Sequence, residues 1–358
     1  MTGRRRRLTA RPPLLGRRQG GSDEPGHAVG RAARRAAARR DVLLRSGCKD
    51  WAAEAPSSRE LAPLLMHGVE HVMEYHAVAQ GSCWAGIPGG PSVQLFAGDA
   101  VMFPHGDAHV VSSAPGMRGL SDVGWFATLD LAHLPLRIAI EGCDAVNPAS
   151  PGFHADATVV CGFLGCDLHP FNPLIEALPH LLHLLHLRAS DDDAWMSRFT
   201  QQAVAESQAG RPGAEAMLAR MSEMMFVHAV RRYTDMLPAE GVGWLTALRD
   251  RFVGRALALM HEQPARPWSI EELGRHVGLS RSSLHERFVH LVGLPPMQYL
   301  AQWRMQAAAR LLLETRASIA AVALDVGYDS ETSFTRAFKR AVGKPPAAWR
   351  RERDALPA

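Results

Sequence analysis

The stretch SIEELGRHVGLSRSSLHERFVHLVGLPPMQY, residues 269–299, decides the fold of this chain because it returns as SIAAVALDVGYDSETSFTRAFKRAVGKPPAAW at residues 318–349. The first residues of the two copies lie 49 apart, whereas Phe288 and Phe338 lie 50 apart. The one extra residue therefore falls inside the second copy, where a turn accommodates it. A repeat at this spacing indicates one supersecondary unit used twice.

Each copy predicts two helices joined by a tight turn, which is a helix-turn-helix unit. The first helices are expected over 270–277 and 319–326, each after a Ser that caps free backbone N–H groups. In the first copy Glu272 completes a capping box. A Gly then supplies the positive φ that ends the helix. These signals are Ser269, Gly278 and Ser280 in the first copy, and Ser318, Gly327 and Ser330 in the second.

Three segments in this region resemble a known family. GLSRSSLHERFVHLVGLPPMQYL, WRMQAAARLLL and IAAVALDVGYDSETSFTRAFKRAVGKPPAAWR are similar to the DNA-binding module of AraC/XylS-type transcription regulators. The resemblance covers residues 250–352 and implies two helix-turn-helix units on one rigid frame, joined by a long helix over 296–314 and bound to double-stranded DNA. The alternative is an adaptor whose two helical repeats bind only protein.

The second helix of each unit carries the residues expected to contact DNA. In both helices apolar residues at i, i+4 and i+7 face the core, and the opposite face is polar. The expected DNA-binding residues are Arg281, Ser282, His285 and Glu286 in the first unit, and Glu331, Thr332, Thr335, Arg336 and Lys339 in the second. Arg336 is expected to read a guanine through two N–H groups. Glu286 is expected either to accept from a cytosine or to pair with a basic neighbour.

Charge is divided by region, although the whole chain carries only +4. Residues 1–40 hold twelve Arg against two acidic residues, and 41–250 hold twelve basic and twenty-four acidic residues. Residues 251–358 hold sixteen basic and ten acidic residues. The basic repeat region suits phosphate contact, and the acidic middle region suits a domain held away from DNA. The Arg-rich start is expected to be disordered.

Residues 41–125 predict a β domain. Short apolar runs, HVMEYHAV, SCWAGI, SVQLF, DAVMFP and AHVVSS, alternate with Gly and Pro turns, which is typical of a sandwich or barrel. GDAVMFPHGDAH fits the pattern G-x5-P-x-G-x-x-H, ending at His109, and EYHAVAQGSCW precedes it. Together they resemble the cupin-type N-terminal domain of one group of AraC-type regulators, and 159–184 and 243–268 continue the resemblance. It implies a β-barrel that senses a small molecule or a redox signal, with effector binding near His76 and His109.

Cupin enzymes hold a metal through two His and a Glu of one motif and a His of the next. Glu74, His76 and His109 are present here, but no H-x-H precedes Glu74, so neither a metal site nor a cofactor is expected. The alternative function is a cupin-type metalloenzyme with an attached helical domain. The incomplete motif favours a regulator that is not an enzyme.

Residues 191–249 predict a helical connector. Asp191 opens one helix, GRPG breaks it, and a second helix over 214–237 carries a broad Met stripe. This stripe either packs on the barrel or pairs with a second copy in a homodimer. HLLHLLH at 180–186 predicts an amphipathic helix, and the two Pro of QPARP at 263–267 predict a flexible joint.

Five cysteines at irregular spacing argue against a disulfide framework. Cys161 and Cys166 flank GFLG, an expected turn, and are candidate redox thiols, with buried inert thiols as the alternative. The longest apolar runs are too short for a membrane span, and no hydrophobic segment follows the Arg-rich start. A cytoplasmic protein is therefore expected.

These observations predict a multidomain protein that combines β and all-α parts. The expected domains are a disordered tail (1–40), a cupin-like effector-sensing β-barrel (41–190), a helical connector (191–249) and a double helix-turn-helix module (250–352). The expected partners are double-stranded DNA, a small-molecule effector and, for an activator, RNA polymerase.

Overall fold

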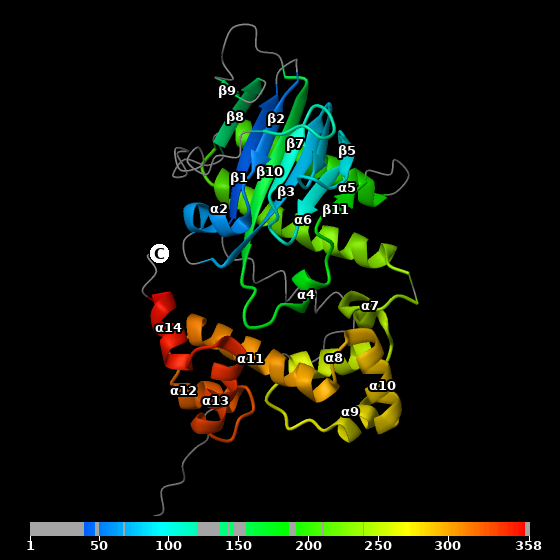
Figure 1. The fold of residues 1–358 in the computed structure, drawn as a ribbon, viewed down its shortest axis with the longest axis vertical. Helices are drawn as coiled ribbons and strands as arrows, with labels where there is room; N and C mark the ends of the chain where they lie inside the picture. Colours follow the sequence, from blue (N-terminus) through cyan, green and yellow to red (C-terminus); the bar gives the residue numbers. More distant parts are fainter. Residues whose placement is uncertain are drawn as a thin grey trace, which may run out of the picture.

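The computed structural model shows an N-terminal half built on β-sheets and a C-terminal half that is all helical (Figure 1). The described residues are 39–46, 50–66, 69–119, 136–141, 144–146, 155–185, 191–209, 211–238 and 240–354. Except for its last two residues, the predicted disordered tail lies outside these ranges. Within them, no helix combines the length and the apolar character that crossing a bilayer demands.

Two sheets form the N-terminal half. The larger has the strand order β11-β6-β3-β10-β1-β8-β9, and the smaller has the order β2-β7-β4-β5. The larger sheet comprises β1 (Arg39–Ser46), β3 (His71–Gln80), β6 (Ala100–Phe103), β8 (Leu136–Glu141), β9 (Asp144–Val146), β10 (Ala157–Cys166) and β11 (Leu182–Leu184). The smaller comprises β2 (Ala52–Ala55), β4 (Ser82–Gly86), β5 (Ser92–Phe96) and β7 (His109–Ser112). Over the described residues no strand pair joins the sheets, so the predicted closed barrel is not observed.

The central strands β3 and β10 are buried on both faces. Because side chains alternate along a strand, Met73 and Tyr75 of β3 belong to the apolar core shared with the helices, whereas Val72 and Val78 belong to the core between the sheets. Gly162 of β10 makes room for Tyr75, since a Cβ there would lie 2.1 Å from the tyrosine ring. This double burial places Glu74 and His76, which share the register of Val72, between the sheets.

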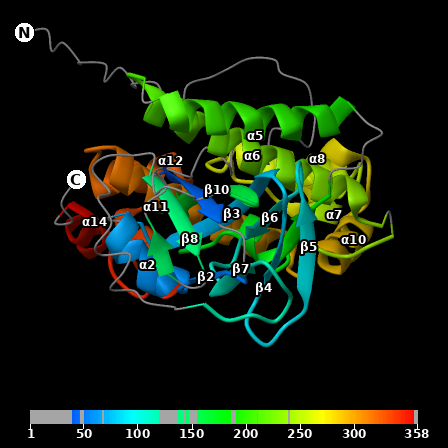
Figure 2. The same cartoon turned by 90° about the horizontal axis from the view of Figure 1, so that it is seen from above.

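Helices cover the outer face of the larger sheet. Figure 2 shows α5 (Asp191–Ala209) and α6 (Ala214–Met236) side by side along that face. The Tyr75 hydroxyl hydrogen-bonds to Ser222 of α6 at 2.8 Å, which fixes the helix on the strand. Two shorter helices, α2 (Ser58–Leu65) and α4 (Pro173–Glu176), precede β3 and follow β10. The two connector helices expected from the sequence are confirmed.

The C-terminal half contains the predicted double repeat. Its helices are α7 (Trp244–Arg249), α8 (Val253–Glu262), α9 (Ile270–Val277), α10 (Arg281–Val292), α11 (Pro296–Glu314), α12 (Ile319–Asp325), α13 (Glu331–Val342) and α14 (Pro346–Asp354). The helix-turn-helix pairs are α9–α10 and α12–α13, and α11 runs between them (Figure 1). The bounds of the predicted first helices and of the long joining helix are confirmed to within one residue.

Three local predictions are wrong. Residues 182–184 of HLLHLLH form a strand that pairs with β6, because a short apolar run fits a buried strand as well as a helix. GFLG is no turn, since it lies inside β10. Residues 263–267 are not a joint between the halves, because this segment is tied into the helical half by Arg304, which donates to the carbonyls of Pro264 and Arg266.

Candidate nucleic-acid interface and buried polar cluster

Side-chain caps fix the start of the second helix in each repeat. Ser280 accepts a hydrogen bond from the Ser283 N–H at 3.2 Å, and Ser330 accepts one from the Ser333 N–H at 3.2 Å. These serines act as the predicted N-caps of α10 and α13. Gly278, at φ 80°, ends α9 in the left-handed region that only Gly adopts freely. The two outward-facing helices therefore begin at positions set by the local sequence.

The capping box predicted at α9 forms only in part. Ser269 accepts from the Glu272 N–H at 3.1 Å, as expected. The Glu272 carboxylate does not turn back to the Ser269 N–H in the expected way, because it pairs with Arg266. The Arg266 guanidinium also lies 4.0 Å from the centre of the Trp268 ring, which favours this arrangement.

The polar faces of α10 and α13 point to solvent, and their apolar faces are buried. Leu284, Phe288, Phe334 and Phe338 are fully buried. The predicted DNA-binding residues lie on the other side, and all are exposed except the half-buried Thr335: Arg281, Ser282, His285, Glu286, Glu331, Thr332, Thr335, Arg336 and Lys339. The structure brings them together as two exposed strips, one on each helix.

Arg281 and Glu286 of α10 differ in whether they pair with another side chain. Arg281 forms an ion pair with Glu271 at 2.8 Å, although both side chains are largely exposed. An exposed pair of this kind contributes little stability, so the Arg281 guanidinium is held only weakly by Glu271. Glu286 makes no hydrogen bond or ion pair with any residue that the structure describes. Of the two expectations for Glu286, pairing with a basic neighbour is thus not observed.

Arg304 of α11 holds the two repeats in a fixed relation. Its guanidinium donates to the carbonyls of Pro264 at 2.7 Å and Arg266 at 2.9 Å, both in the first unit. It also donates to the Gly327 carbonyl of the second unit at 3.2 Å. Burial lowers the pKa of Arg304, but three carbonyl acceptors keep the charge satisfied. The frame between α10 and α13 is therefore stiff.

A buried polar cluster lies between the two sheets. Glu74 and His76 come from β3, His109 begins β7, and Cys161 comes from β10. His76 Nε2 lies 2.6 Å from His109 Nε2, and His76 Nδ1 lies 2.9 Å from the Cys161 sulfur. Glu74 Oε2 lies 3.6 Å from His109 Nε2. The structure thus brings together the two predicted effector-binding histidines and adds Glu74 and Cys161.

The hydrogen bonds of this cluster fix where its protons lie. The Asp107 carbonyl can only accept, so His109 Nδ1 donates to it at 2.9 Å. His109 Nε2 is then the acceptor of a bond from His76 Nε2–H, and His76 Nδ1 accepts from the Cys161 thiol. Burial lowers the pKa of His109 to about 4 and, with His109 nearby, lowers that of His76 well below its ordinary value. Burial also raises the pKa of Glu74 well above its ordinary value, so the cluster favours uncharged groups.

The donor set of this cluster fits a divalent metal ion. Glu74, His76 and His109 each offer a ligand atom, and these atoms lie within 4.8 Å of one another. Two neutral imidazoles and one carboxylate form the set that binds non-haem iron or zinc. The outer nitrogen of each imidazole already has a partner, but binding of a metal ion by His76 Nε2 would require the His76 proton to move to Nδ1, which would then donate to the Cys161 sulfur. The missing H-x-H pattern argues against such a site, whereas the fold nevertheless brings Glu74, His76 and His109 close together.

The two candidate redox cysteines are buried rather than exposed. Cys161 is 7% exposed and Cys166 is 6% exposed. Burial raises the pKa of Cys166 far above its ordinary value. A thiol of this kind reacts slowly, because the thiolate is the reactive form. Cys161 and Cys166 lie in one strand and belong to different apolar cores, so they do not face each other.

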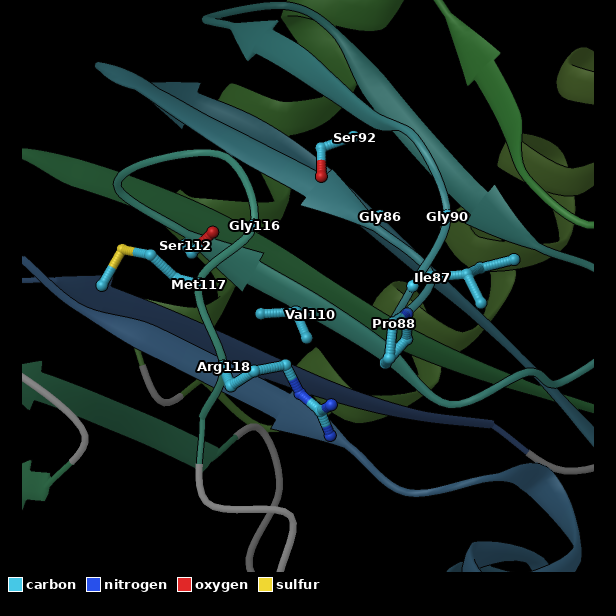
Figure 3. A pocket seen from close by; sticks show the side chains of 11 residues that line it. Gly86, Ile87, Pro88, Gly90, Ser92, Val110, Ser112, Gly116, Met117 and Arg118 are labelled. Atoms are coloured by element: carbon cyan, nitrogen blue, oxygen red, sulfur yellow. The ribbon is translucent and has the colours of Figure 1, made fainter.

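A small cavity at one end of the smaller sheet, about 40 Å³, does not suit an organic effector (Figure 3). Its lining residues are Gly86, Ile87, Pro88, Gly89, Gly90, Ser92, Val110, Ser112, Gly116, Met117 and Arg118. Arg118 is engaged with Glu54 through two hydrogen bonds at 2.8 and 2.6 Å, and it lowers the pKa of that carboxyl despite partial burial. A space of this size holds water only.

The two halves meet through the loop that follows β10. The Phe171 N–H donates to the side-chain carbonyl of Gln306 at 3.1 Å, and Gln306 lies buried on α11. The Phe171 ring packs edge-on against Tyr299, at 5.5 Å between ring centres. The strand that carries Cys161 therefore continues directly into the contact with the helical half.

Comparison with known proteins extends these observations. A sequence profile of the Cupin family matches residues 33–235, more than half of the chain, and a profile of the helix-turn-helix domain matches residues 273–352. The chain is 29% identical over 278 residues to the HTH-type transcriptional regulator AlkR of Acinetobacter baylyi, covering 77% of this chain and 87% of that protein. It is also 29% identical over 282 residues to a putative AraC-like transcription regulator of Streptomyces lividans, covering 78% and 87% of the two chains.

Another relative and a solved structure are similar to this chain as well. The RCS-specific HTH-type transcriptional activator RclR of Escherichia coli is 26% identical over 288 residues, covering 80% of this chain and 87% of that protein. The DNA-binding domain of AdpA, solved in complex with a target DNA, is 30% identical over 30% of this chain and 95% of that chain, with a TM-score of 0.29.

Proposed function

Because the chain belongs to the AraC-type transcription regulators with a cupin-type N-terminal domain, we propose that α10 and α13 enter successive major grooves on one face of a DNA duplex. The observation that carries this proposal is the pair of exposed polar strips held on one stiff frame by Arg304. The nineteen residues of α11 span about 28 Å at 1.5 Å per residue. That length is close to one turn of B-DNA, about 34 Å.

The exposed residues divide into base-reading and phosphate-binding groups. Arg336 projects from the second reading helix and matches the O6 and N7 acceptors of guanine. Glu286 is free to accept from a cytosine amino group, since no described residue neutralises it. Arg281 and Lys339 suit phosphates, because their charges contact the backbone without sequence preference.

The contact between the halves sets how the cupin half acts on DNA binding. Phe171 and Tyr299 meet on the side of α11 that carries Gln306, while the reading strips on α10 and α13 stay exposed. Docking of the cupin half in this arrangement therefore leaves the DNA-binding face uncovered and does not mask it. A signal in the cupin half acts instead on the position of α11, because a ligand shifts an equilibrium only by its differential affinity.

The buried cluster is the proposed site at which that signal is received. Glu74, His76 and His109 are closed off from solvent, so a small species such as a metal ion fits them better than an organic molecule. A bound divalent ion would supply charge that stabilises the ionised Glu74 carboxylate. Strand β10, which pairs with β3 beside the cluster, continues into the loop whose Phe171 contacts α11.

The remaining roles concern assembly and place of action. Met217 and Met224 lie seven residues apart on α6 and are about half exposed, at 50% and 53%. Met225 and Ala229 of the same helix are buried against the N-terminal half, so that side packs on the sheets. We assign only the exposed Met217 and Met224 to a homodimer contact, since exposed apolar patches commonly mark interfaces. If the protein is an activator, it would also contact RNA polymerase. A regulator that binds DNA in this way would act in the cytoplasm.

The proposed function is tested by titrating labelled duplex DNA with the full chain at several salt concentrations. Tight binding that weakens linearly on a log–log plot against salt is expected, since each neutralised phosphate releases a counterion. Arg281→Ala should reduce the slope by about one unit. No binding at low salt, or binding that salt does not weaken, would contradict the proposal.

A metalloenzyme is the second candidate, because Glu74, His76 and His109 form a metal-binding donor set. The relatives found are transcription regulators, which favours a non-enzyme. Metal analysis of the purified chain, together with an assay for turnover, distinguishes the metalloenzyme from the regulator. Stoichiometric iron accompanied by oxidation of a substrate would establish the enzyme.

A further inference from the structure

The helices α10 and α13 are equivalent in length, in their caps and in their buried faces. Each contains twelve residues, begins after a capping serine and ends at a glycine in the left-handed region. Two equivalent positions of each helix are fully buried, Leu284 and Phe288 in α10 and Phe334 and Phe338 in α13. A residue of α10 and the residue fifty positions later in α13 therefore hold the same place in the two helix-turn-helix units.

One of these shared places carries opposite charges in the two helices. The sixth residue is Glu286 in α10 and Arg336 in α13. Both side chains are exposed, and neither forms an ion pair or a hydrogen bond with the parts of the chain that the structure describes. Four residues earlier on the same face both helices carry a hydroxyl group, on Ser282 and Thr332. The two faces thus share one polar group and differ in the sign of the next.

The carboxylate and the guanidinium bind opposite partners in a major groove. A guanidinium only donates hydrogen bonds, and an ionised carboxylate only accepts them. Guanine presents two acceptors, O6 and N7, whereas cytosine presents a donor, its N4 amino group, with no acceptor beside it. Adenine also has an amino group, but its N7 acceptor lies next to that group and repels a carboxylate oxygen. Arg336 therefore matches guanine, and Glu286 matches cytosine.

We propose that the two units read one kind of base pair in opposite orientations, with both helices inserted in the same direction. A G·C pair lies under Arg336, and a C·G pair lies under Glu286 at the equivalent position about 10 base pairs away. This inference rests on the proposed function, because it requires α10 and α13 to enter successive grooves. Arg304 keeps the two units in a fixed relation, so the two positions stay equivalent. One strand of the site then shows G in one part and C in the other.

The opposite charges also make α10 depend on α13 and give the bound protein a direction. Lys339 and Arg340 of α13 are exposed cations, whereas α10 has Val289 and His290 at the same places. Phosphates attract the face of α13 and repel Glu286, so α10 enters its groove favourably only where an amino group receives the carboxylate. Exchanging the two base pairs weakens both contacts at once. The protein therefore lies on its site in one preferred orientation.

The test is the selection of random duplexes by the full chain and by a variant in which the two charges are exchanged, Glu286→Arg with Arg336→Glu. The exchange leaves the net charge unchanged, so general attraction to DNA stays the same. The natural chain should select G and C at the equivalent positions of the two parts, each at least about fivefold over the inverted pair. The exchanged variant should select the same motif with these two bases interchanged. Glu286→Arg alone should select G in both parts.

The matched control is Glu262→Arg with Arg316→Glu, which exchanges the same charges at two exposed positions outside the reading helices. This control should select the natural motif. The proposal is overturned if the natural chain selects the same base at both equivalent positions, or if the exchanged variant keeps the natural motif or selects none. A two-part motif of the natural chain would still support the proposed function in those cases. If the natural chain selects no motif at all, the proposed function fails, and the opposite reading fails with it.

Discussion

The proposed base contact of Arg336 can be tested by separating base reading from general attraction to DNA. Arg336→Ala should cost roughly 1–3 kcal/mol on the preferred duplex and relax specificity at one base pair, because two hydrogen bonds to a guanine are lost. Fluorescence anisotropy with the preferred duplex and single-base variants measures both effects. Arg316→Ala removes the same charge from an exposed position outside the reading helices and serves as the control. An equal loss on every duplex would mean that Arg336 contacts only phosphate.

His109 tests whether the buried cluster binds a metal ion. Zinc added to the chain should raise the unfolding temperature, because an ion bound only by the folded state stabilises it by about 2.7 kcal/mol at a hundred times its dissociation constant. His109→Ala should abolish this rise, since one of three ligand atoms is gone. His290→Ala changes an exposed histidine of α10 and should leave the zinc response intact. An unchanged rise in His109→Ala would show that zinc binds elsewhere.

The contacts within the buried cluster could not be predicted from the sequence. His76 and His109 were expected near an effector, and the structure places their rings 2.6 Å apart at the Nε2 atoms. Cys161 joins them from 85 residues further along the chain than His76. Neither spacing nor composition indicates such a contact, because strand pairing between β3 and β10 creates it.

At the scale of helices and strands, Asp250 links α8 to α10 and gives a pH dependence. Its carboxylate accepts from the Phe252 and Val253 N–H groups at 3.0 and 2.9 Å and from Arg287 at 2.9 Å. Burial acts to raise the pKa of Asp250, but these bonds outweigh it and lower the pKa below its ordinary 3.8. The unfolded chain therefore takes up a proton at a higher pH than the folded chain. The stabilisation is fully present above about pH 4 and is lost as the pH falls through the lowered pKa.

Asp250→Ala should reduce the free energy of unfolding by about 1–2 kcal/mol at pH 7, since a helix start loses its acceptor. The difference from the natural chain should shrink as the pH falls below about 4. Urea unfolding at several pH values measures it, with Asp235→Ala on α6 as the control. A difference that stays constant with pH would show that the charge of Asp250 contributes nothing.

Elements whose signals are local were predictable, and elements whose partners are distant were not. The four Ser caps and the glycines that end helices lie within a few residues of what they stabilise, so α9 to α13 follow from the sequence. The run at 182–184 becomes a strand only because β6, some eighty residues earlier in the chain, pairs with it. The arrangement of the strands as two sheets likewise depends on long-range pairing.

For the whole molecule, the proposal is that the contact between the halves transmits a signal from the cupin part to the DNA-binding part. Gln306→Leu removes the acceptor of the Phe171 N–H and should loosen this contact. Because the reading strips are exposed in the docked arrangement, affinity for the preferred duplex should stay within about twofold to threefold, less than 1 kcal/mol. Gln298→Leu, at an exposed position of the same helix, is the control. Binding that becomes tenfold tighter only in Gln306→Leu would show instead that docking of the cupin half inhibits DNA binding.

The central claim is that two helices read one face of a duplex together. Selection of random duplexes by the full chain, followed by sequencing of the bound fraction, tests it most directly. The predicted result is a motif in two parts, with centres about 10 base pairs apart, one turn of the duplex. Arg336→Ala should erase preference at one base pair in one part, and Glu286→Gln should alter one base pair in the other. Enrichment of a single short motif, or of no motif, would contradict reading by both helices.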